Sequence, residues 1–301
     1  MASPIRVQLD FDTPQPERRD ATVRAVFNEV ERQCTRFDAN SDLMQANAAA
    51  GNWHQVGAYC FEALAAASTA HDMTDGVFDP RVLRTLTDLG YALTLDLADG
   101  DVAVDRPLPA PRPARGRWVL DLDEKRMTVR VGPEPIDLGG IGKGLALRWA
   151  AAELVAGGCP GFLLDAGGDC VAGGAGPDGG GWRIGVEDPN DGADPVAVLE
   201  LVDVACATSS TRLLNWRVGN SRVHHLIDPR TGRPGGGDLA SVTVVADDAA
   251  EAEIWSKVLF LHGDEIAEVA DRHELAALWV REDGSPGCTA AMRPHVVWER
   301  P

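Results

Sequence analysis

Residues 224–232, with the sequence HHLIDPRTG, gather two histidines, a carboxylate and a guanidinium at a predicted strand end. A histidine titrates near neutral pH and can act as a general base. Adjacent residues on a strand point to opposite faces, so only one of His224 and His225 can serve a given site. We take His225, close to Asp228, as a candidate general base, although residues 228–232 also read as an ordinary turn.

A glycine-rich segment, residues 137–144 (DLGGIGKG), lies between a predicted strand at residues 135–138 and a predicted helix. Backbone N–H groups in such a turn, together with the helix N-terminus, favour an anion. Lys143 would add a full positive charge. The P-loop spacing is absent because Asp137 stands where that motif needs glycine, and the Rossmann spacing is absent as well. A tight strand-to-helix turn without a ligand is the alternative interpretation.

Two further segments are weaker indications. Residues 74–80 (TDGVFDP) follow a predicted helix, and Phe78 would either stack on a flat ring or belong to the core. Residues 208–212 (TSSTR) offer hydroxyls and a guanidinium to a phosphate, but this composition is also common on surfaces.

The composition excludes some classes of protein. The chain has 301 residues with 46 Asp and Glu against 28 Lys and Arg, a net charge of −18. A nucleic-acid binder needs basic surface to neutralise phosphates, so the charge argues against that class. No apolar stretch is long enough for a membrane span, and residues 1–20 do not resemble a secretory signal. We therefore expect a cytoplasmic protein, in which the six cysteines stay reduced.

Hydrophobic periodicity predicts irregularly alternating helices and strands, and hence an α+β fold with mixed or antiparallel sheets. The expected helices cover residues 17–37, 60–73, 143–155 and 251–262. The expected strands cover residues 7–11, 118–123, 127–131, 161–165, 182–186, 196–201, 204–208, 222–227, 241–246, 276–281 and 289–293.

Taken together, these segments resemble the FAD:protein FMN transferases of the ApbE family. The matching pieces follow in the family's order over nearly the whole chain: residues 36–43, 74–80, 137–144, 165–169 and 225–232. The resemblance implies two interlocked lobes whose sheets are flanked by helices. It also implies that residues 1–301 form one flavin transferase unit, with an FAD cleft between the lobes.

The implied activity is cleavage of the FAD pyrophosphate, transfer of FMN to a Ser or Thr hydroxyl of a partner flavoprotein, and release of AMP. By position, His225 and Asp228 would be the catalytic residues beside the pyrophosphate. The residues implied to contact FAD are Phe37, Val77, Phe78, Asp79, Lys143, Leu226 and Ile227. Two alternatives stay open: an FAD pyrophosphatase that uses water as the acceptor, and a non-catalytic FAD-binding protein.

The resemblance is least complete at the metal. It implies Mg²⁺ ligands at Glu253, at Ser256 and at the backbone carbonyl of Ala146, but Lys257 stands where the family has a threonine oxygen. An ammonium has no lone pair to offer a metal. Either the Lys257 ammonium replaces the ion, or Lys257 points away and the other ligands hold Mg²⁺ together with substrate phosphates.

Overall fold

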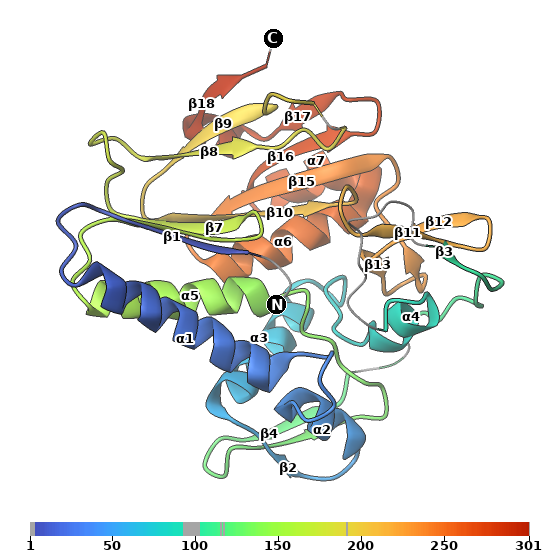
Figure 1. Ribbon diagram of the computed structural model, residues 1–301. Helices are drawn as coiled ribbons and strands as arrows, with labels where there is room; N and C mark the ends of the chain where they lie inside the picture. The colour runs from blue at the N-terminus through green and yellow to red at the C-terminus, as the bar shows by residue number, and fades with distance from the viewer. Residues whose placement is uncertain (1–3, 93–102, 115, 117, 191, 301) are drawn as a thin grey trace. The chain divides into compact units, whose positions relative to one another are not determined.

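A computed structural model describes residues 4–92, 103–114, 116, 118–190 and 192–300 (Figure 1). The chain forms two compact units. Unit 1 comprises residues 1–2, 29–142 and 213–235, and unit 2 comprises residues 3–28, 143–212 and 236–301. Among the residues described, no helix is long and apolar enough to cross a membrane. The mixture of helices with several antiparallel sheets confirms the predicted α+β class.

Unit 2 contains a seven-stranded antiparallel sheet in the order β1-β6-β7-β10-β15-β16-β17. Its strands are β1 (Ile5–Leu9), β6 (Phe162–Ala166), β7 (Asp169–Gly173), β10 (Val204–Ser210), β15 (Leu239–Ala246), β16 (Ala276–Arg281) and β17 (Pro286–Cys288). The interior strand β15, between β10 and β16, is buried along almost its whole length. Such a strand needs apolar side chains on both faces, which explains the run LASVTVVA.

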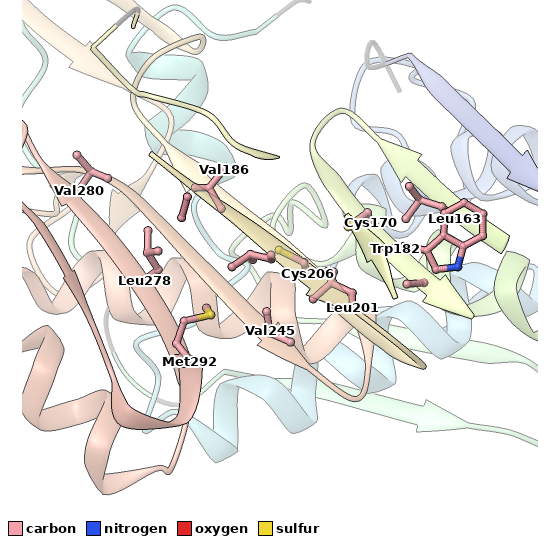
Figure 2. Close-up of a cluster of buried hydrophobic side chains, with 13 residues drawn as sticks. Leu163, Cys170, Trp182, Val186, Leu201, Cys206, Val245, Leu278, Val280 and Met292 are labelled. Carbon is pink, nitrogen blue, oxygen red and sulfur yellow. The ribbon is translucent and has the colours of Figure 1, made fainter. Parts of the chain in front are cut away.

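One face of this sheet packs against a second, three-stranded sheet of unit 2. That sheet has the order β18-β9-β8 and consists of β8 (Trp182–Val186), β9 (Ala197–Leu201) and β18 (Val296–Glu299). The core between the two sheets includes Trp182, Leu201, Cys206, Leu278 and Met292 (Figure 2). This close packing holds the two sheets of unit 2 together.

The helices of unit 2 lie mainly on the other face. The helix α6 (Ala249–His262) runs along β10 and β15 (Figure 1). It begins at Asp248, whose side chain accepts from the N–H groups of Ala250 and Glu251, and it ends at Gly263, where φ is 57°. The other helices are α5 (Gly142–Ala156), α7 (Ile266–Arg272) and the short η1 (Gly263–Glu265) and η2 (Ala290–His295). The helix α1 (Pro16–Cys34) begins in unit 2 and ends in unit 1.

Unit 1 combines helices with short strands. Its helices are α2 (Asp42–Ala48), α3 (Ala58–Met73) and α4 (Leu83–Asp88). Its strands are β2 (His54–Gln55), β3 (Ala103–Val104), β4 (Leu120–Asp123), β5 (Thr128–Val131), β11 (Asn215–Val218), β12 (Ser221–His224), β13 (Ile227–Asp228) and β14 (Arg233–Pro234). Trp216 is fully buried, and its indole N–H donates to the carbonyl of Leu89 at 2.7 Å.

Three predicted strands differ from the structure. Residues 135–138 are not a strand, because the side chain of Asn47 hydrogen-bonds both the N–H and the carbonyl of Ile136 at 2.9 Å. Residues 222–227 divide into β12 and β13. Residues 289–293 lie mostly in the 3₁₀ helix η2, which begins after Thr289 anchors its hydroxyl to the backbone of Leu275 and Ala277.

Candidate functional site

A fully buried carboxylate, Glu253 on α6, is the centre of the polar cluster in unit 2. Its Oε2 accepts from the backbone N–H of Gly144 at 2.8 Å. Its Oε1 lies 3.1 Å from Nζ of Lys257 and 3.8 Å from Nζ of Lys143. Burying a carboxylate is costly unless it is paired and hydrogen-bonded, and here both oxygens have donors.

Lys143 also forms an ion pair with Asp169, the first residue of β7. Asp169 is buried, and its Oδ1 accepts from the N–H of Thr208 at 3.0 Å. Burial acts to lower the pKa of Lys143, but the negative charges of Asp169 and Glu253 outweigh it and raise the pKa above its ordinary value. Lys143 is therefore protonated at neutral pH, and its ammonium is held at the beginning of α5.

Ser256 completes the cluster on the same helix. Its hydroxyl donates to the carbonyl of Glu253 at 3.0 Å and lies 2.8 Å from the hydroxyl of Ser209 on β10. Both serines are buried. Ala146, one turn into α5, is fully buried as well.

Two features of the chain hold α5 against α6 within unit 2. A Cβ on Gly144 would lie 2.7 Å from Cα of Ala250, so only glycine permits this approach. The guanidinium of Arg148 on α5 pairs with Asp248, the residue that caps α6. Burial acts to raise the pKa of Asp248, but Arg148 and the backbone N–H groups of Glu251 and Ala250 outweigh it and lower the pKa below its ordinary value.

The cluster does not offer what a magnesium ion needs. Mg²⁺ requires oxygen ligands at about 2.0–2.1 Å in octahedral geometry. Oε1 of Glu253 faces the Lys257 ammonium, and the hydroxyl of Ser256 is already engaged with Ser209 and a carbonyl. Within the described ranges, no three His, Cys, Asp or Glu side chains are grouped so that they would hold a metal ion. The donor set suits two ammonium ions better than a divalent cation.

The aromatic side chain of Phe37 lies in unit 1 and is 40% exposed. The guanidinium of Arg36 lies 4.3 Å from the ring centroid of Phe37 and 4.2 Å from that of Tyr91. Nε of Arg36 is 3.4 Å from a carboxylate oxygen of Asp137, and both side chains are buried. The N–H of Asp137 donates to the carbonyl of Pro80 at 2.8 Å. Unit 1 thus brings together residues from segments 36–43, 74–80 and 137–144.

Val77, Phe78 and Asp79 are all buried in unit 1. The carboxylate of Asp79 binds the guanidinium of Arg81 through both oxygens, at 2.6 and 2.9 Å. A bidentate pair of this kind fixes the turn that presents these residues. Phe78 is part of the packed interior, the alternative that the sequence left open.

The two histidines differ in their surroundings. Burial lowers the pKa of His224 to about 4; a hydrogen bond with the backbone of Gly235 opposes this shift, and the charge of Arg222 adds to it. Its Nδ1 faces the N–H of Leu226 at 3.3 Å. His225 follows the end of β12, with its Nδ1 3.3 Å from the carbonyl of Leu214. His225 lies outside β12, so strand alternation does not apply to this pair of histidines, and the choice of His225 stays a prediction.

Asp228 is buried, and Arg230 binds both of its carboxylate oxygens, at 2.9 and 3.1 Å. The turn closes with the N–H of Gly232 donating to the Asp228 carbonyl at 2.7 Å. Leu226 and Ile227 are buried, and Ile227 packs in a cluster with Trp216.

Sequence reasoning missed Asp169, Gly144 and Arg36 as members of these clusters. Asp169 and Gly144 were quoted within segments 165–169 and 137–144, so their motifs were the available signal. Nothing in the local sequence indicated that Arg36 is buried against Asp137.

Comparisons of this chain with protein families, with curated proteins and with solved structures agree with one another. The model of the ApbE family matches residues 1–279. The FAD:protein FMN transferase of Escherichia coli (strain K12) is 33% identical over 50% of this chain and 43% of its own length. The FAD:protein FMN transferase of Rhodobacter capsulatus is 31% identical over 94% of this chain and 54% of its own length. The matched segments thus cover about half the length of these two relatives. The crystal structure of an ApbE protein from Thermotoga maritima superposes with a TM-score of 0.85 at 26% identity, covering 99% of this chain and 96% of that one.

Proposed function

Because this chain belongs to the ApbE family, we propose that it is an FAD:protein FMN transferase. It cleaves the pyrophosphate of FAD, transfers FMN to a Ser or Thr hydroxyl of a partner flavoprotein, and releases AMP. The family match over residues 1–279 is the observation that carries this proposal, and the names of the relatives supply the reaction.

The geometry of unit 2 supports a role for Lys143 with the FAD phosphates. Its protonated amine lies at the first turn of α5, where the helix dipole also favours a negative charge. Phosphoryl transfer depends mainly on positioning and on neutralising the oxygens of the transferred group.

In unit 1, the exposed ring of Phe37 is suited to stacking on the flavin. The Arg36 guanidinium lies 4.3 Å from the centroid of this ring, and the Tyr91 ring lies 5.9 Å from it, so both side chains hold the Phe37 ring in place. The buried segment that holds Val77, Phe78 and Asp79 would contact FAD through its rigid turn, and Leu226 and Ile227 would do so from the turn before Asp228.

His225 is the proposed general base. The hydroxyl oxygen of the acceptor attacks the phosphorus of the FMN moiety, its proton passes to His225, and the bond from that phosphorus to the bridging oxygen breaks as AMP leaves. Asp228 stays ion-paired with Arg230 and positions the turn. Mg²⁺ has no part in this step, because the donor set around Glu253 does not fit that ion.

The test is product analysis after incubation with FAD. The full chain is mixed with FAD and with a set of Ser- and Thr-containing flavoprotein acceptors, AMP and FMN are separated by chromatography, and acceptor masses are measured. The proposal predicts AMP together with an acceptor that has gained the mass of FMN. AMP with free FMN and unchanged acceptors would indicate a pyrophosphatase, and intact FAD that co-purifies with the chain would indicate a binding protein.

A further inference from the structure

The chain has three lysines, Lys125, Lys143 and Lys257, among its 28 Lys and Arg residues. Arginine is therefore its usual cation. Two of the three lysines nevertheless lie within 4 Å of the same carboxylate, Glu253, which is fully buried. Lysine, the rarer of the two cationic residues, is therefore concentrated at the Glu253 carboxylate, and this placement needs a physical explanation.

The difference between the two side chains supplies it. Arginine presents a broad planar fork, whereas the lysine ammonium is a compact point charge with donors in several directions. A compact cation is the closest match that a protein side chain offers to a metal ion. Lys257 is one helical turn after Glu253 on α6, so the helix itself sets the ammonium at the carboxylate, with Nζ 3.1 Å from Oε1.

The four groups of the cluster that form ion pairs within 4 Å also balance in charge. Glu253 and Asp169 contribute two negative charges, and Lys143 and Lys257 contribute two positive ones. A divalent ion at Oε1 would have to displace Lys257 and would leave an excess of positive charge beside a fully buried carboxylate. The remaining oxygen of Glu253 would offer no alternative, because the N–H of Gly144 already donates to it.

We propose that the Lys257 ammonium is the resident cation of Glu253 and takes the place of a divalent metal ion, so that the chain binds its flavin dinucleotide without Mg²⁺. The part that concerns the dinucleotide rests on the proposed function, whereas the part that concerns the cation does not. Lys257 acts here as a positioning residue, fixing the carboxylate that in turn holds the first turn of α5.

The first experiment measures metal binding without any nucleotide. Free Mn²⁺ is followed by electron paramagnetic resonance as it is titrated into the wild-type full chain and into Lys257→Thr, which replaces the ammonium with an oxygen ligand. The wild type is expected to show no saturable site, whereas Lys257→Thr is expected to show saturable, one-to-one Mn²⁺ binding. Lys125→Thr is the matched control, because Lys125 is exposed in the β4–β5 turn; it should behave as the wild type.

The second experiment measures FAD affinity by flavin fluorescence in EDTA and in excess Mg²⁺. The wild type should bind FAD equally in both, whereas Lys257→Thr should bind more tightly with Mg²⁺. A wild-type affinity that rises saturably with Mg²⁺, or a one-to-one Mn²⁺ site in the wild type, would overturn the inference. The wild-type titrations need no variant, so the result stands even if Lys257→Thr does not fold.

The two arms separate this inference from the proposed function. If the chain binds no FAD under either condition, the proposed function fails, and the Mn²⁺ titration alone decides the identity of the cation. If FAD binds and the wild type also holds Mn²⁺, the proposed function survives and the inference fails.

Discussion

The backbone N–H of Gly144 donates to Oε2 of Glu253 at 2.8 Å and joins two helices whose contact residues are 109 positions apart in the sequence. The bond is possible because α5 and α6 approach closely at a residue without a side chain. The need for glycine at the last position of the DLGGIGKG segment therefore comes from helix packing within unit 2. The same close contact fixes the position of the neighbouring residue, Lys143.

A methyl group at position 144 should disrupt this contact. In Gly144→Ala, the new Cβ would lie 2.7 Å from Cα of Ala250, so backbone atoms would have to move. We expect a loss of unfolding free energy of about 1–3 kcal/mol, as for other overpacked sites. Chemical denaturation measures it.

Gly142→Ala is the control for this substitution. A Cβ at Gly142 meets nothing within 4 Å, and the residue begins the same helix. Gly142→Ala should leave the free energy of unfolding unchanged or raise it slightly, because alanine has a higher helix propensity than glycine. Equal losses in the two variants would contradict the packing explanation.

The buried ion pair of Arg36 and Asp137 should contribute strongly to the free energy of unfolding. A double-mutant cycle is needed to measure that contribution. Arg36→Met leaves the Asp137 carboxylate without its guanidinium, and we expect a loss of about 3–5 kcal/mol. The double variant Arg36→Met/Asp137→Asn should recover part of this loss, which a double-mutant cycle measures. Strictly additive losses would show that the two side chains do not interact.

The sequence predicted elements well where one periodicity governs a segment. The strands at residues 182–186 and 276–281 match β8 and β16, and the helix at residues 143–155 differs from α5 by one residue at each end. The ends of α6 also follow from the local sequence: Asp248 caps its N-terminus, and the glycine after His262 ends it.

The strand predictions fail where a side chain distant in the sequence makes the hydrogen bonds of the backbone. Asn47 bonds the backbone of Ile136 as a neighbouring strand would, so a segment with a strand-like pattern needs no sheet. Thr289 does the same with Leu275 and Ala277. The cluster around Glu253 was anticipated in part, because Lys257 follows one helical turn later, but its link to Asp169 depends on tertiary packing.

His224 should make the stability of the protein depend on pH. Its pKa is about 4 in the folded protein, whereas an unfolded histidine titrates near 6.5. The unfolded chain therefore binds the proton first as the pH falls, so this contribution is fully present above about pH 6.5 and is lost between about pH 6.5 and 4. We expect a loss on the order of 1–3 kcal/mol over that window.

The measurement is denaturation of the wild type and of His224→Gln at several pH values from neutral to acid. The variant should be less stable at neutral pH and should show a flatter dependence on pH over this range. If the two proteins lose stability in parallel, His224 is not the group that titrates.

His225 should affect turnover rather than folding. If it accepts the proton of the attacking hydroxyl, His225→Ala should lower the rate of FMN transfer by about 10²–10⁴-fold, the usual contribution of a general base. Transfer is followed by acceptor mass, and denaturation should give a stability close to that of the wild type. Full activity in His225→Ala would remove this residue from the reaction.

The central claim is that the bond cleaved in FAD is the one between the FMN phosphorus and the bridging oxygen, with the FMN phosphorus passing to the acceptor. The most direct measurement uses two preparations of FAD, one labelled on the FMN phosphorus and one on the AMP phosphorus, each incubated with the full chain and an acceptor protein. The account predicts that the FMN label becomes covalently bound to the acceptor while the AMP label appears as an equal amount of free AMP. Both labels appearing in free nucleotides, or the AMP label bound to the acceptor, would contradict it.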